Sequence, residues 1–138
     1  MICDAAGTPL VIHTTPANVR DDVPALRLIQ RIPPIHGPRG RPRRKPDALV
    51  GDRGYGFAAL INAVWALCIV AMLARRGSEH GSGLGRVRWV VERTMSWIGN
   101  FRRIKFCYER RGRHFQAFHH LAAALICARR LTHPLLER

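Results

Sequence analysis

An almost uninterrupted apolar run, residues 57–74, limits what this chain can fold into more than any other feature. Asn62 is its only polar residue, and Arg75 follows it directly. A run of this length is close to the minimum for a helix that spans a membrane. The alternative is a soluble domain that takes up the run as a helix followed by a buried strand at 68–73. The run leaves both fold classes open.

The charge of the chain indicates a polyanionic partner. Its 138 residues include 23 Lys and Arg against 9 Asp and Glu, for a formal net charge of +14. Only Lys45 and Lys105 are lysines, and the planar guanidinium of arginine suits two-point contact with phosphate. Nucleic acid is therefore the first partner to consider. A solvated basic surface, from a GC-rich genome that favours arginine codons, would give the same count.

The four cysteines exclude a zinc or disulfide framework as the basis of the fold. They stand at Cys3, Cys68, Cys107 and Cys127, without the paired spacing that such frameworks need. The apolar fraction, 47 %, is too high for an intrinsically disordered chain. We expect reduced thiols in a cytosolic protein of about one domain.

Hydrophobic periodicity predicts an α/β chain. Short strands are expected at 2–3, 9–15, 47–51 and 68–73, helices at 18–32, 86–101 and 114–131, and loops at 33–46 and 77–85. Asn18 is the expected N-cap of the first helix. In the last helix, the spacing of Phe115, Phe118, Leu121, Ala122 and Leu125 predicts a face packed in the core.

Two basic segments interrupt this pattern. Residues 37–46 form a loop rich in Gly, Pro and Arg, and residues 102–113 interleave Phe106 and Tyr108 with Lys and Arg. For the first segment, an extended arm along phosphates and a solvated linker fit the sequence equally well.

Two of the nine acidic residues are candidates for chemistry. Asp52 ends a predicted buried strand, and Glu92 lies in the middle of a predicted helix. Two such carboxylates, if they converge, offer the hard oxygen ligands that Mg²⁺ prefers, and a divalent ion promotes phosphodiester chemistry. Ordinary ion pairs fit as well, Asp52 with Arg53 in a turn and Glu92 with Arg88 one helical turn away.

Several blocks of this sequence match one family in order and over nearly the whole chain. The blocks are RVRWVVERTMSWIGNFRR at 86–103, DRGYG at 52–56, and the segments 4–10, 37–44, 74–85, 108–111 and 129–131. The first resembles the Glu-bearing segment, and the second the motif of the second Asp, of bacterial insertion-sequence DDE transposases of the families four and five group.

The resemblance implies an RNase H-like (retroviral-integrase-like) fold and a role for each matched residue. Asp52 would be the second metal-binding acid and Glu92 the third, with Mg²⁺ or Mn²⁺ as the cofactor. Water would attack a phosphodiester at the transposon end, and the freed 3′-OH would attack target DNA. Contacts with DNA are expected from Arg88, Arg93, Arg102, Arg103, Lys105, Arg41, Arg43, Arg44 and Lys45. The expected setting is the bacterial cytoplasm, in association with the nucleoid.

The chain departs from the family's pattern at four points. Gly85 stands where the family's signature has Tyr, and Gly99 where it has Lys, so that Arg102 or Arg103 would supply that charge. The apolar run 57–74 replaces a charged helix. The strand with the first catalytic Asp, which in the family precedes the Asp4 turn, is not among these residues.

We therefore expect residues 1–138 to be a partial DDE catalytic domain that lacks its first strand and is inactive alone. Its partners would be transposon ends, target DNA, and either an upstream-frame transposase half or a second copy of the chain. No membrane partner is expected. Two other functions stay open: a non-catalytic basic DNA-binding or regulatory protein, and a single-span membrane protein.

Overall fold

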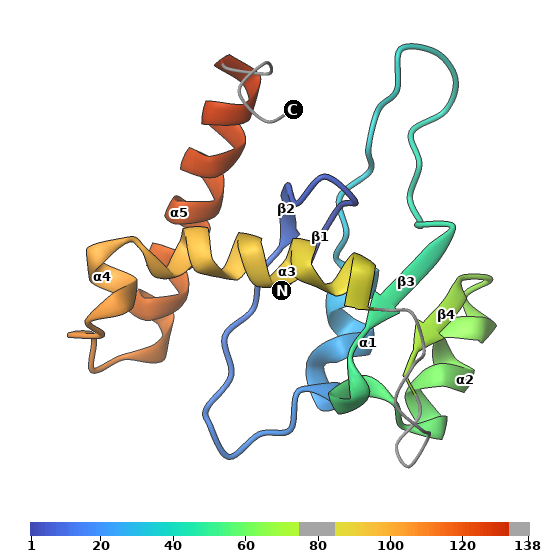
Figure 1. Cartoon of the computed structure of the whole chain (residues 1–138), viewed down its shortest axis with the longest axis horizontal. Helices are drawn as coiled ribbons and strands as arrows, with labels where there is room; N and C mark the ends of the chain where they lie inside the picture. Colours follow the sequence, from blue (N-terminus) through green and yellow to red (C-terminus); the bar gives the residue numbers. More distant parts are fainter. Residues whose placement is uncertain (75–84, 133–138) are drawn as a thin grey trace. The chain divides into compact units, whose positions relative to one another are not determined.

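The computed structural model describes residues 1–74 and 89–132 in full, and the backbone of 85–88 (Figure 1). The chain divides into two compact units. Unit 1 comprises Met1–Pro16 and Val90–Arg138, and unit 2 comprises Ala17–Trp89. The expected α/β class is confirmed, since short strands alternate with helices. That residues 1–138 form one catalytic domain stays a prediction, as does most of the loop expected at 77–85, which lies outside the described residues.

Unit 1 begins with a small antiparallel hairpin. Its strands β1 (Ile2–Cys3) and β2 (Pro9–Val11) pair with Ile2 opposite Val11 and Cys3 opposite Pro9. The Asp4 carboxylate closes the turn between them by accepting hydrogen bonds from the backbone N–H groups of Ala6 and Thr8. The second strand was expected to reach residue 15 and ends at Val11.

The early end of β2 has a clear cause on the last helix. Gln116 accepts hydrogen bonds from the N–H and the hydroxyl of Thr14 and donates one to the Ile12 carbonyl oxygen. These three bonds draw residues 12–14 away from β1 and onto the helix, so that their backbone groups are satisfied outside the sheet.

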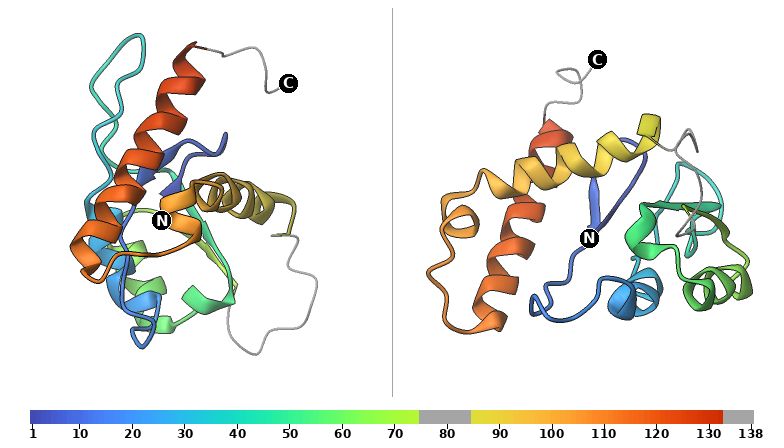
Figure 2. Two further views of the ribbon diagram at one scale, coloured as in Figure 1. Left: turned by 90° about the vertical axis from the view of Figure 1, so that its left-hand side faces the viewer. Right: turned by 60° about the horizontal axis from the view of Figure 1, so that its bottom comes forward.

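Three helices complete unit 1: α3 (Gly85–Gly99), which belongs to this unit from Val90 onward, α4 (Arg102–Lys105) and α5 (Gly112–Thr132). The predicted helices at 86–101 and 114–131 are confirmed. Figure 2 shows the C-terminal end of α3 crossing the middle of α5. The buried cluster at this crossing consists of Ile12, Ile98, Ala122 and Ile126, with Trp97, Phe101 and Ile104 packed around it.

The predicted core face of α5 is confirmed at Ala122, is partly buried at Phe115 and Phe118, and is wrong at Leu121 and Leu125. Leu121 and Leu125 are 55 % and 42 % exposed, whereas Ala122 and Ile126 are buried. Residues 121–125 contain only Leu and Ala, so the helical spacing of apolar residues fits two neighbouring faces of α5. Ala122 and Ile126 share the buried cluster with Ile98 of α3, so the face that contains them is the one that packs in the core.

A buried spine orients α3 against the hairpin. Val90, Thr94 and Ile98 follow one another at four-residue spacing and are all buried. The Thr94 hydroxyl lies 2.9 Å from the carbonyl oxygen of Gly7 and 2.9 Å from that of Val90. Gly7 has φ +89°, and a Cβ there would lie 2.9 Å from the Thr94 hydroxyl oxygen. Only glycine therefore fits this contact without displacing it.

Unit 2 is a βαβ unit with a further helix. Strand β3 (Ala48–Gly51) runs parallel to β4 (Val70–Leu73), in register from Ala48 opposite Val70 to Gly51 opposite Leu73. The connection contains the 3₁₀ turn η1 (Arg53–Tyr55) and α2 (Ala58–Ala66), and α1 (Asp22–Gln30) packs against α2. The buried hydrophobic residues of unit 2 are Ala25, Leu28, Ile29, Ile32, Leu60, Val64, Ile69 and Leu73.

The first helix starts later than predicted. It begins at Asp22, with Asp21 at the N-cap position, and Asn18 has no part in it. Pro24 explains the difference, because proline has no N–H to donate and fits only the first turn of a helix. A helix begun at Asn18 would have placed Pro24 in its interior.

The apolar run divides as a helix followed by a strand, as the soluble interpretation predicted. Helix α2 has 9 residues and, at about 1.5 Å per residue, is roughly 14 Å long, half the thickness of a bilayer core. Within the described residues, no helix is long and apolar enough to cross a membrane.

Burial of the strands of unit 2 is only partial: Val70, Met72 and Ala48 are exposed. The helices of unit 2 cover one face of this sheet, so alternate side chains stay in water.

The basic segment 37–46 is the tip and return of a long loop. An isolated antiparallel bridge joins Ile35 to Arg43, with N–O distances of 2.8 and 2.9 Å. Gly40, at φ +92°, lies at the tip, where a Cβ would meet no other atom within 4 Å. The segment is thus a closed, largely solvated loop, which fits the solvated interpretation better than a fully extended arm.

Replacing Gly7 by Ala is expected to destabilise unit 1 by about 2–5 kcal/mol. An L-residue at positive φ costs about 1–2 kcal/mol, and disturbing the buried Thr94 hydrogen bonds costs about 1–3 kcal/mol more. Gly40→Ala is the matched control, since it has the same sign of φ and open space. Urea unfolding of both variants measures the difference. Equal losses for the two would contradict the role given to the Gly7–Thr94 contact.

Candidate functional site

Asp52 lies where β3 ends and η1 begins, with its carboxylate exposed to solvent. Its Oδ1 accepts a hydrogen bond of 2.8 Å from the N–H of Gly54, two residues on. A Cβ at residue 54 would lie 2.9 Å from that oxygen. Glycine at 54 therefore lets the carboxylate fold back over the turn, and the N-cap bond fixes one of its oxygens.

The strand end under Asp52 is tightly packed. A Cβ at Gly51 would lie 2.7 Å from Leu73 Cδ2 of the neighbouring strand, and 3.4 Å from the Tyr55 ring. Burial raises the pKa of Tyr55, and the negative charges of Asp21 and Asp52 raise it further. Tyr55 is thus a neutral phenol at physiological pH, beside the carboxylate.

Glu92 is exposed on α3. It lies two residues from Thr94, about 160° around the helix from the buried spine. The spine and the Arg93 side chain, which donates a 2.7 Å hydrogen bond to the Ala6 carbonyl oxygen, hold the rotation of α3. The hairpin turn thereby sets the direction in which the Glu92 carboxylate leaves the helix.

The structure places the two predicted acids in different units, Asp52 in unit 2 and Glu92 in unit 1. Each has the exposure that a ligand of a hydrated cation needs. No group of three or more His, Cys, Asp or Glu side chains suited to a metal occurs in the part of the chain that the structure describes. That Asp52 and Glu92 share one ion stays a prediction.

The predicted DNA-binding residues of unit 1 fall into two classes. Arg93 and Arg103 make contacts within the unit: Arg93 stacks on Trp97 at 4.7 Å, and Arg103 pairs with Glu109 and lies 4.9 Å from the Phe118 ring. Arg102 and Lys105 are exposed on the short helix α4. The remaining candidate, Arg88, lies near the start of α3, in the part of that helix that belongs to unit 2, and its side chain is outside the described part.

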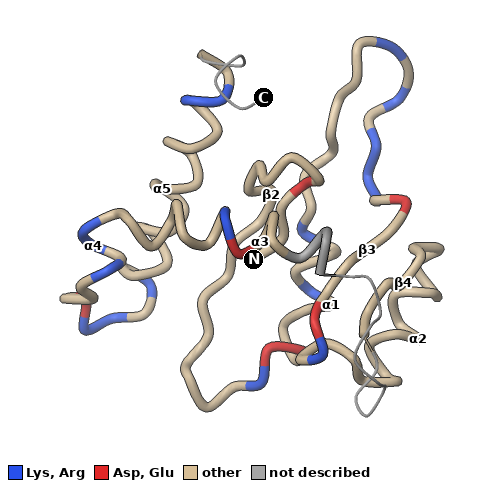
Figure 3. The backbone as a smooth tube through the Cα atoms, in the orientation of Figure 1, with Lys and Arg blue, Asp and Glu red and all other residues tan. Residues whose placement is uncertain are grey.

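In unit 2 the predicted DNA-binding residues follow the loop before β3, where Figure 3 shows a run of positive charge. Arg43 forms an ion pair of 2.6 Å with Asp47, and Lys45 donates to the Leu67 carbonyl oxygen at 3.2 Å. Arg41 and Arg44 are exposed. In each basic segment, some cations are exposed to solvent and others bind neighbouring groups of the protein.

Nothing in the sequence indicated a role for Arg130 and Trp97, which the structure brings together with Arg93. Arg130 of α5 donates a 2.8 Å hydrogen bond to the same Ala6 carbonyl oxygen, and its guanidinium lies 5.8 Å from the Trp97 ring. The contact joins residues 124 positions apart, so no local sequence pattern predicts it. The spacing of Asp52 and Gly54, in contrast, is typical of a side chain that caps its own turn.

Asp52→Ala is expected to lower the free energy of unfolding by about 1 kcal/mol, because it removes the N-cap acceptor of η1. Asp52→Asn keeps an acceptor oxygen and is expected to unfold like the wild type, within a few tenths of a kcal/mol. Urea denaturation separates the two. A large loss in Asp52→Asn would mean that the charge itself is needed for folding.

Comparison with known proteins identifies the family of this chain. The family model described as "Transposase DDE domain" matches residues 1–127. A curated protein of Burkholderia cepacia, named "Putative transposase for insertion sequence element IS402", is 46 % identical over 127 residues, which cover 92 % of this chain and 60 % of that protein. The chain therefore spans about 60 % of the length of this relative. No solved structure matches. Since the family model covers most of the sequence, this chain belongs to the transposases with a DDE domain.

Proposed function

We propose that this chain is part of an insertion-sequence transposase and takes part in DNA transposition. The observation that supports this most directly is the Asp52 turn: an exposed carboxylate, clasped by the Gly54 N–H, at the carboxyl end of a parallel strand. Ligand sites in open α/β sheets gather at this end of the strands. In a chain of this family, the same position is the one expected for a catalytic acid.

We further propose an RNase H-like fold for the complete domain. Among the described strands, β1 pairs only with β2, and β3 only with β4. Each two-stranded sheet therefore has an edge that another strand would complete. In the family, a strand bearing the first catalytic Asp precedes the hairpin. Such a strand, supplied by an upstream-frame transposase half, would add the remaining acid of the site.

The two acids of this chain suit a divalent metal of the Mg²⁺ or Mn²⁺ class. Carboxylate oxygens are the ligands that these ions take, and both side chains are exposed. Asp52 and Glu92 would hold the ion, and when bound it supplies activation of water and stabilisation of the leaving 3′ oxygen. Since this chain contributes two acids of a three-acid site, we expect it to bind DNA without cleaving it.

The charge of the chain supports DNA as the partner. The cations expected to neutralise phosphates first are the exposed Arg41, Arg44, Arg102 and Lys105. Arg43, Lys45, Arg93 and Arg103 hold local structure and keep their charge, and Arg88 lies at the start of α3. Such an interface releases counterions on binding, so its affinity falls steeply with salt. The protein would act in the bacterial cytoplasm, on transposon ends and target DNA at the nucleoid.

The test compares two proteins. One is the chain alone, and the other is a fusion of this chain with the part of the Burkholderia cepacia relative that lies outside the matched region, joined in the same order as in that relative. The chain alone is expected to bind duplex DNA with strong salt dependence and without cleavage in Mg²⁺. The fusion is expected to cleave a labelled transposon-end duplex. Asp52→Asn or Glu92→Gln should reduce cleavage by at least about 10³-fold, a few kcal/mol of lost transition-state stabilisation, and leave binding intact.

Asp47→Asn is the matched control, because it removes an exposed carboxylate five residues from Asp52. It should leave cleavage within about twofold of the wild type. Cleavage that survives Asp52→Asn would overturn the assignment of Asp52. A fusion that folds and binds DNA but cleaves in no variant would favour the non-catalytic DNA-binding protein instead.

A further inference from the structure

The loop between α4 and α5 keeps two aromatic rings in water. Phe106 follows the last residue of α4, and Tyr108 stands two residues further on. Their exposed fractions are 51 % and 63 %. Phe101 and Ile104, just before them, pack against the core cluster of unit 1. The exposure of the two rings is therefore a property of this loop and not of the whole region.

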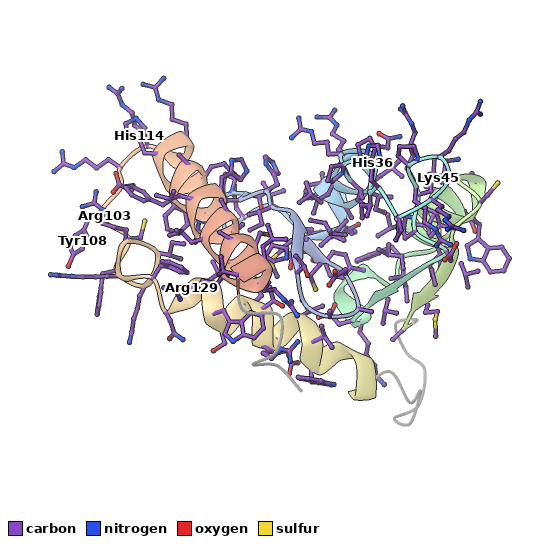
Figure 4. All side chains as sticks on the ribbon, turned by 90° about the horizontal axis from the view of Figure 1, so that it is seen from above. His36, Lys45, Arg103, Tyr108, His114 and Arg129 are labelled. Atoms are coloured by element: carbon purple, nitrogen blue, oxygen red, sulfur yellow. The ribbon has the colours of Figure 1, made fainter. Side chains whose placement is uncertain are left out.

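A cation lies over each ring. The Lys105 Nζ is 5.7 Å from the centroid of Phe106, and the Arg103 guanidinium carbon is 6.0 Å from that of Tyr108. Figure 4 shows Arg103 and Tyr108 close together at this end of unit 1. The only acid of the segment 102–113, Glu109, is mostly buried and pairs with Arg103. The surface that faces solvent is thus aromatic and cationic.

We propose that Phe106 and Tyr108 form a stacking platform for unpaired nucleobases of a DNA strand, whose phosphates the surrounding cations bind. Proteins that hold single strands combine a basic surface with aromatic rings, because every base has a face that can stack. The inference rests on the proposed function in taking DNA as the ligand. It adds which form of DNA this surface prefers.

Two observations favour an unpaired strand over other occupants. Bases inside a B-form duplex present only their edges in the grooves, whereas a strand end or a single-stranded stretch presents the faces that a ring requires. The exposed cations of the segment 102–113 favour a nucleic acid over an uncharged partner, because each nucleotide supplies a phosphate at close intervals. These cations are Arg102, Arg103, Lys105, Arg110, Arg111 and Arg113.

The test measures DNA binding by the full chain with the double variant Phe106→Leu/Tyr108→Leu. One probe is a duplex with a 3′ overhang that contains 2-aminopurine, and the other is the blunt duplex of the same sequence. The wild type is expected to bind the overhang at least about tenfold more tightly and to quench the 2-aminopurine fluorescence. The double variant should lose both effects and keep its affinity for the blunt duplex within about twofold, since every cation remains.

Two controls keep the result specific. Trp65→Leu removes a ring that is 64 % exposed, on α2 of unit 2, and should change neither measurement. The exchange Phe106→Tyr/Tyr108→Phe keeps two rings and should retain the preference for the overhang. Circular dichroism establishes that each variant is folded.

The outcomes separate this inference from the function on which it rests. If the double variant keeps the preference and the quenching, or the wild type has neither, the stacking platform is refuted and a protein partner becomes the better occupant of this surface. If the wild type fails to bind the blunt duplex, or binds it without dependence on salt, the proposed function itself is contradicted.

Discussion

The contact between Gly7 and Thr94 is the constraint on which unit 1 depends. A hairpin turn of the first residues lies directly against α3, and the buried threonine hydroxyl satisfies the Gly7 carbonyl oxygen at 2.9 Å. Arg93 and Arg130 add hydrogen bonds to the neighbouring Ala6 carbonyl from two helices. Turn, α3 and α5 are thereby fixed to one another, and the direction of Glu92 follows from a backbone contact on the other side of its helix.

A different local device holds Asp52. Its carboxylate is fixed by its own turn, through the Gly54 N–H, and not by a distant partner. The parallel pair β3–β4 supplies the strand end, and the close approach of Gly51 to Leu73 keeps that end narrow. The two candidate acids are thus held by separate contacts, Asp52 by its own turn and Glu92 by the tertiary packing of α3. We therefore expect that either acid can be replaced without unfolding the region around the other.

Local features were predictable from sequence, and features that depend on distant contacts were not. The hairpin, the parallel strands and α5 follow from alternating or helical patterns together with Gly and Pro. The start of α1 was mispredicted because Asn18 is a good cap, although Pro24 forbids a helix begun there. Periodicity correctly placed Ala122 in the core of α5 but also placed Leu121 and Leu125 there, because the pattern alone does not show which of two neighbouring faces meets α3. The hydrogen bond of Arg93 to Ala6 spans 87 positions, so the sequence did not show that this residue holds a turn, and its contact with DNA stays a prediction.

The central claim, that Asp52 and Glu92 bind one metal ion, is tested most directly by Mn²⁺ titration followed by electron paramagnetic resonance. If the acids share an ion, Asp52→Asn, Glu92→Gln and the double variant lose the same site, and the double variant loses no more than either single one. Asp47→Asn should bind as the wild type does. Losses that add independently, or a wild-type chain that binds no Mn²⁺ beyond the level of the double variant, would contradict the shared site.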